Sequence, residues 1–167
     1  MPEPVGTALI VAVACVAAWS DVRTRRIPNA LTVTALAAAL ALSLAGGGVA
    51  QMLGALGAAG VVLLLGIPLF ALGLLGGGDV KLMIAFGAAL GMERLLPALL
   101  LTAVAGGMLA LVEAVRQGVL VQVLANCRTL VVGWFAPVAV APVTGHTTLT
   151  LPYGVAIGVG AVLAWLL

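Results

Sequence analysis

Two long stretches of the sequence carry no charged residue, and they constrain the fold more than any other feature. These stretches are residues 27–78 and 129–167. A helix needs about 20 consecutive apolar residues to cross a bilayer core of about 30 Å. Charged residues make up only 7% of the chain, whereas a soluble domain carries about 25%. A water-soluble globule could not cover its surface with so few polar groups, so the sequence predicts an all-α membrane protein.

Charged residues and glycine clusters divide the chain into six predicted transmembrane helices. The run Gly46-Gly47-Gly48 is expected to separate two spans inside residues 27–78, because glycine supplies turn conformations without steric cost. The spans are predicted at about 4–20, 30–46, 52–75, 80–92, 95–113 and 151–167. Residues 1–167 therefore form a single integral-membrane domain.

The basic residues indicate how these spans are oriented. With six spans and the N-terminus outside, six of the seven basic residues fall on the cytoplasmic side: Arg23, Arg25, Arg26, Lys81, Arg116 and Arg128. Only Arg94 falls outside. Cytoplasmic loops carry an excess of Lys and Arg, so the predicted orientation is N-out and C-out.

Residues 117–141 allow two interpretations. Polar side chains on one helical face, around Arg128, favour an amphipathic helix in the membrane interface over about 117–135. A Pro- and Thr-containing loop that holds the single histidine, His146, would follow it. The alternative is a seventh crossing.

Asp21 and Asp79 are the candidate functional residues. Under the predicted topology Asp21 ends the first span and Asp79 begins the fourth, both on the cytoplasmic side. An ionisable group at membrane depth is unfavourable and is by default a functional candidate. Two carboxylates that face one recess can share a proton, so that one activates a water as a base while the other acts as an acid. The alternative places Asp21 in a juxtamembrane charge cluster and makes Asp79 an acidic residue at a helix N-terminus.

The segments around both aspartates resemble a known family. The run Gly76-Gly77-Gly78-Asp79-Val80-Lys81 is similar to the G-x-G-D-x-K element of type IV prepilin peptidases, which are membrane aspartyl proteases. Residues 21–29, an Asp followed by basic residues and Ile-Pro-Asn, resemble the first-aspartate segment of that family. The run Leu151-Pro152-Tyr153-Gly154 resembles the start of its final helix. The resemblance is closest to the short form found in tight-adherence (Flp) pilus systems.

The resemblance implies a multi-pass aspartyl endopeptidase of the bacterial inner membrane, with its active site facing the cytoplasm. Its partners would be the type IV or Flp-type prepilins and pseudopilins whose leader peptides it cleaves. Asp21 and Asp79 would be the catalytic pair, and the supporting motif residues would be Gly76, Gly78, Lys81, Arg23, Arg26, Pro28 and Asn29. The basic residues among them either anchor the topology or orient an aspartate. Long forms of the family carry a methyltransferase insertion between the first two spans, and the connection from Asp21 to Asn29 is too short to hold it.

No cofactor or metal ion is expected. Cys15 and Cys127 are the two cysteines, and neither belongs to a run with metal-ligand spacing. A net charge of +2 is too small to indicate nucleic acid, so the lipid bilayer is the expected environment, and the oligomeric state is left open. The alternative function, from another class, is a small proton-coupled transporter that uses Asp21 and Asp79 as relay groups. Carriers more often show pairs of interrupted helices in corresponding halves of the chain, and the sequence shows no such symmetry.

Overall fold

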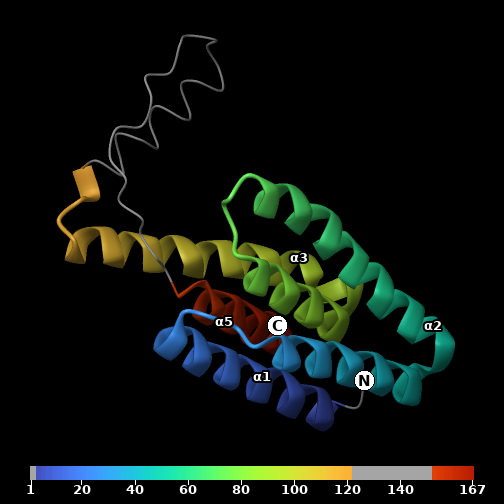
Figure 1. Ribbon diagram of the computed structural model, residues 1–167. Helices are drawn as coiled ribbons and strands as arrows, with labels where there is room; N and C mark the ends of the chain where they lie inside the picture. Colours follow the sequence, from blue (N-terminus) through green and yellow to red (C-terminus); the bar gives the residue numbers. More distant parts are fainter. Residues whose placement is uncertain (1–2, 122–151) are drawn as a thin grey trace. The chain divides into compact units, whose positions relative to one another are not determined.

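The computed structural model describes residues 3–121 and 152–167, and within these ranges it contains helices and no strand. The helices are α1 (Glu3–Thr24), α2 (Asn29–Ala71), α3 (Gly77–Arg116) and α5 (Tyr153–Leu166), drawn in Figure 1. Contacts group Met1–Gly106 and Pro152–Leu167 into one compact unit, and Gly107–Leu151 into a second. The predicted interfacial helix at 117–135, its alternative as a seventh crossing, and the His146 loop lie wholly or mostly outside the described residues.

Helices α2 and α3 each contain a glycine break at which the helix changes direction (Figure 1). In α2 the non-helical residues are Gly47 and Gly48, and Gly48 has a φ of 67°. In α3 the break is Gly91, with a φ of 71°. Glycine adopts such positive φ values without the steric penalty that a Cβ atom imposes. Each of these helices therefore consists of two limbs, which meet at a turn made of one or two residues.

The second limb of α2 ends at Ala71, earlier than the predicted end at residue 75. Gly73 has a φ of 70°, and its N–H donates to the carbonyl of Phe70 at 2.9 Å. The N–H of Leu74 donates to the carbonyl of Leu69, also at 2.9 Å. This pair of hydrogen bonds is the Schellman arrangement, in which a glycine closes a helix. The chain therefore leaves α2 early, and residues 72–76 connect it to the start of α3.

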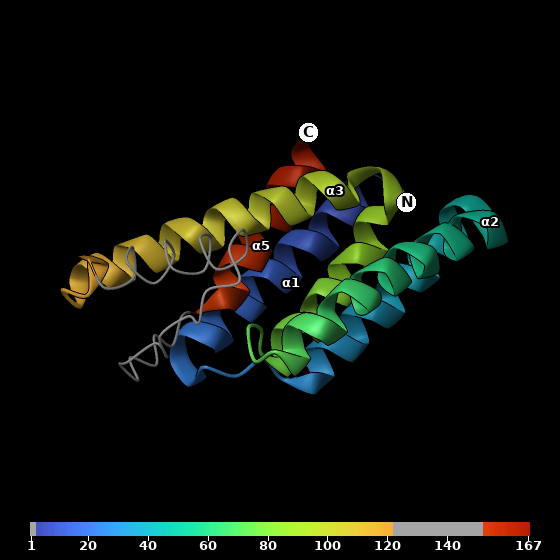
Figure 2. The ribbon, with the colours of Figure 1, turned by 90° about the horizontal axis from the view of Figure 1, so that it is seen from above.

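Small residues form much of the contact between helices. Helix α1 packs against α5 and α2, and Figure 2 shows α1 and α5 side by side. Ala17 and Ala39 are fully buried, and a Cβ atom on Gly158 of α5 would lie only 3.2 Å from that of Ala14 in α1. Such small residues let helix backbones approach closely. In lipid, this close packing takes over from the hydrophobic effect as the force that holds helices together. The interior is therefore held by close backbone packing.

Three helices of the described residues are long and apolar enough to cross a membrane: Pro4–Thr24, Asn29–Ala71 and Gly77–Arg116. Their large apolar side chains are often turned outward, as at Leu64 and Leu96, which are 73% and 65% exposed. Large apolar side chains are exposed on all three of these helices. The described residues therefore form an all-helical fold in which three helices have the length and composition of membrane spans.

Candidate active site

Asp21 lies in the last turn of α1, where the chain turns sharply toward α2. Its backbone carbonyl accepts a hydrogen bond from the N–H of Arg25 at 2.9 Å, and Arg25 has a φ of 52°, which is unusual for a residue with a side chain. The hydroxyl of Ser20 donates to the carbonyl of Arg26 at 2.8 Å, and the hydroxyl of Thr24 is shared between the carbonyls of Ser20, at 2.8 Å, and Arg26, at 3.1 Å. These bonds fix the turn, and with it the position of Asp21, which is only 6% exposed.

Asp79 lies in the first turn of α3, directly after the glycine triplet. Its half-buried carboxylate accepts a hydrogen bond from the backbone N–H of Gly76. An acidic residue at the third helical position that reaches back to the residue before the helix is one half of a capping box. A Cβ atom on Gly76 would lie 2.9 Å from Oδ2 of Asp79, so glycine at position 76 makes this close approach possible.

Two contacts join the Asp21 segment to the Asp79 segment. The ammonium group of Lys81 donates to Oδ1 of Asn29 at 2.9 Å. A Cβ atom on Gly78 would lie 3.3 Å from that of Ile27, so the glycine triplet packs directly against the turn between α1 and α2. Asp21 and Asp79 therefore belong to two segments that pack against each other. The structure thus brings together two segments that lie more than 50 residues apart in the sequence.

Helix α5 supplies a third element of the site. The backbone N–H of Gly154 donates to Oδ2 of Asp21 at 2.7 Å, in a buried position. Reasoning from the sequence did not include Gly154 among the site residues. The signal was the Leu-Pro-Tyr-Gly run at the start of the final helix, but no chemical role could be read from it.

The other predicted supporting residues contact the site less directly. Arg23 is exposed, and its guanidinium lies over the ring of Trp19, 4.1 Å from the centroid. Arg26 takes part through its backbone carbonyl, which accepts the two hydroxyl bonds of the turn. Pro28 precedes α2, and its carbonyl accepts the N–H of Leu31 at 3.1 Å. Arg26 and Pro28 therefore shape the turn by their backbone.

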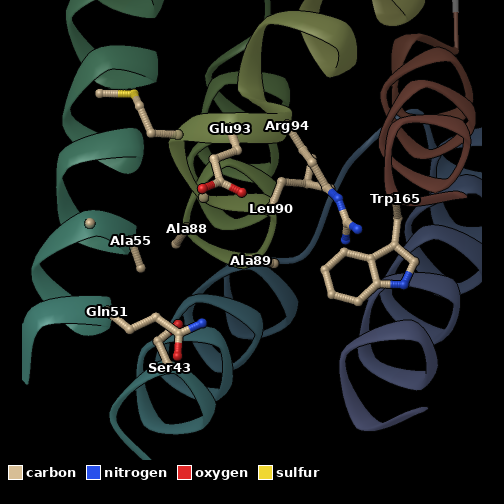
Figure 3. A pocket seen from close by; sticks show the side chains of 12 residues that line it. Ser43, Gln51, Ala55, Ala88, Ala89, Leu90, Glu93, Arg94 and Trp165 are labelled. Carbon is tan, nitrogen blue, oxygen red and sulfur yellow. The ribbon is translucent and has the colours of Figure 1, made fainter. Parts of the chain in front are cut away.

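A polar cavity of about 380 Å³ lies apart from the aspartates. Figure 3 shows Glu93 and Gln51 pointing into the space between α2 and α3, and Arg94 reaching toward Trp165. The Arg94 guanidinium lies 4.4 Å from the centroid of the Trp165 ring. Trp165 is in the last turn of α5, whereas Gly154 is in its first turn. This cavity is therefore at the opposite end of the helices from the aspartate pair.

Among residues 3–121 and 152–167, no group of three or more His, Cys, Asp or Glu side chains could hold a metal ion. The expectation of chemistry without metal or cofactor remains a prediction.

Comparison with known proteins identifies the family. No curated protein and no solved structure matches the chain. Residues 8–111 match the type IV leader peptidase family. The matched region covers well over half of the chain and includes both aspartates, the turn after Asp21 and the glycine triplet before Asp79. On this match, the chain belongs to the type IV leader peptidase family.

Proposed function

We propose that this protein is a membrane-embedded aspartyl endopeptidase that removes the leader peptide of type IV or Flp-type prepilins and pseudopilins. The observation that carries the proposal is the packing of the glycine triplet before Asp79 against the turn that follows Asp21, together with the hydrogen bond from Lys81 to Asn29. Each aspartate comes from one of the two segments that resemble the prepilin peptidase motifs. Two carboxyl groups that face one recess would share one proton, because like charges a few ångströms apart cannot both ionise.

The proposed reaction uses that shared proton. The ionised carboxylate removes a proton from a water molecule, and the water oxygen bonds to the scissile carbonyl carbon. The protonated carboxyl group stabilises the developing oxyanion, and a proton then passes to the leaving amine as the carbon–nitrogen bond breaks. The new carboxylic acid gives up its proton to the amine, so the products are a carboxylate and an ammonium group, and the two aspartates return to their starting state.

An apolar groove supports a substrate with a membrane-embedded segment. Its volume is about 520 Å³, and its walls come from the second limb of α2, residues 74–75, α3 and Tyr153. Tyr153 precedes Gly154, which binds Asp21. Gly66 in the groove wall packs against Val80, because a Cβ atom on Gly66 would lie 2.7 Å from a methyl group of Val80, next to Asp79. An apolar helix in this groove would hold its polar end near both aspartates.

We infer six spans in the inner membrane: α1, the two limbs of α2, the two limbs of α3, and α5. The basic residues of the turn after α1, together with Lys81 and Arg116, lie at the ends of helices that this arrangement places in the cytoplasm. The active site then faces the cytoplasm, where a basic leader can lie near the anionic inner leaflet.

This orientation predicts the location of the C-terminus. A reporter domain that is active only in the cytoplasm, fused after Leu167, is expected to be silent, because six spans return the chain to the outer face. The same reporter inserted after Gln117, at the end of α3, is expected to be active. Activity of both fusions would mean that residues 118–152 cross the membrane.

The proposed function predicts cleavage by the purified protein alone. Detergent-solubilised protein mixed with a prepilin is expected to release the leader, and chelation of metal ions by EDTA should not slow the reaction.

Mass spectrometry of the mature peptide, with S-adenosylmethionine present, should show no added methyl group. Only residues 25–28 connect α1 to α2, and this connection is too short to hold the methyltransferase insertion that the long forms of the family carry. Solute-driven proton uptake by reconstituted protein, without cleavage, would favour the transporter instead.

A further inference from the structure

The carboxylate of Asp21 takes the place of a capping group for α5. The backbone N–H groups in the first turn of a helix have no acceptor within the helix. Pro152, which precedes α5, makes no side-chain capping bond, and proline has no N–H of its own. The N–H of Gly154 finds its acceptor in Oδ2 of Asp21, 133 residues away in the sequence. The contact is buried.

Gly154 is suited to this contact by its size. A Cβ atom at position 154 would lie 3.0 Å from Oδ2, 3.1 Å from Cβ and 3.3 Å from Cγ of Asp21. All three distances are shorter than ordinary van der Waals contacts. Gly154 is not among the glycines with positive φ in the described chain. The position therefore requires glycine for space beside the carboxylate, and its backbone conformation would admit other residues.

Helix α5 is held along α1 at more than one point, so its N-terminus can fix Asp21 in place. Near the other end of both helices, the indole N–H of Trp165 donates to the hydroxyl of Thr7 at 2.7 Å. A carboxylate bound to such a docked helix has less freedom than one on the α1–α2 turn alone.

We propose that Gly154 is a positioning residue for Asp21, and that the first turn of α5 is therefore part of the active site. The N–H of Gly154 occupies one oxygen of the Asp21 carboxylate and leaves the other oxygen for the water and Asp79. The inference rests on the proposed function, because it takes Asp21 to be catalytic. It extends the site beyond the family match, which ends at residue 111.

The test compares Gly154→Ala with Gly158→Ala. Both variants add one methyl group between α5 and α1, and the added Cβ atoms would meet their neighbours at 3.0 and 3.2 Å. Gly154→Ala is expected to lower kcat for prepilin cleavage by about 10²-fold, since small displacements of a catalytic group have effects of that order. KM should change less than about twofold, because Gly154 acts through Asp21. Gly158→Ala should keep kcat within about threefold. Equal losses of kcat in both variants, or a loss of kcat/KM that comes only from a higher KM, would overturn the proposal.

A second measurement needs no activity and so separates this inference from the proposed function. Gly154→Ala is expected to lower the melting temperature of the detergent-solubilised protein. In an Asp21→Ala background two of the three close contacts are absent, so the same substitution should lower it much less. If Gly154→Ala prevents folding, Asp21→Ala should restore it. Equal destabilisation in both backgrounds, or failure to fold in both, would contradict the contact between Gly154 and Asp21.

Discussion

Substitution of Asp79 or Asp21 by asparagine is expected to reduce prepilin cleavage by about 10³-fold or more, because removal of a positioned acid or base has effects of 10²–10⁴-fold. Each single variant should lose nearly as much activity as the double variant, since the two groups act as a unit. Asparagine keeps a side-chain oxygen that can accept the N–H of Gly76 at position 79 or of Gly154 at position 21. The variants should therefore remain folded.

The measurement is the cleavage rate of each purified variant, with melting temperature as the check on folding. Glu93→Gln is a matched control, because it neutralises a carboxylate in the polar cavity at the opposite end of the helices. It should cleave at the wild-type rate. Retention of more than about a tenth of the wild-type rate in either aspartate variant would exclude the proposed pair.

The bond between Lys81 and Asn29 gives the second prediction. Lys81→Ala and Asn29→Ala are each expected to lower kcat/KM by about fivefold, because their hydrogen bond ties the Asp79 segment to the Asp21 segment at an exposed position, where a hydrogen bond contributes about 1 kcal/mol. The double variant should lose no more than either single one, since both substitutions remove the same contact. Asn29→Asp keeps an acceptor oxygen for Lys81 and should retain most of the activity.

A double-mutant cycle on kcat/KM checks this pair. Arg23→Ala is the control, because Arg23 is exposed and lies over Trp19; it should change kcat/KM less than threefold, as do many surface charges. Additive losses in the Lys81 and Asn29 variants would mean that each acts separately, for example as a contact to the leader peptide or to lipid.

The location of the aspartates could be predicted from the sequence because charge is so rare in this chain. Asp21 and Asp79 stand at the edges of long apolar runs, and the structure has them in the last turn of α1 and the first turn of α3. The turn at Gly47 and Gly48 was expected from a glycine triplet. Gly91 is a single glycine, which helices often tolerate, so the sequence alone did not identify it as the turn in α3.

The partners of the site residues could not be predicted, because they come from tertiary packing. The sequence left Lys81 as a topology anchor or a group that orients an aspartate, whereas its ammonium group binds Asn29. The Gly154 contact joins opposite ends of the chain and depends on how α5 lies along α1. No local pattern encodes that arrangement, although the Pro-Tyr-Gly sequence does mark the start of α5.

The turns at Gly48 and Gly91 have a consequence for how the chain enters the bilayer. Each joins two helical limbs without a loop, so almost no unpaired backbone has to cross the hydrocarbon core. Under the proposed orientation, the hairpin formed by α2 carries no charged side chain, and the turn of α3 carries Glu93 and Arg94, which are opposite in sign. The net charge moved outward by each turn is zero. The membrane potential, which acts in proportion to translocated charge, should therefore do no net work on either hairpin during insertion.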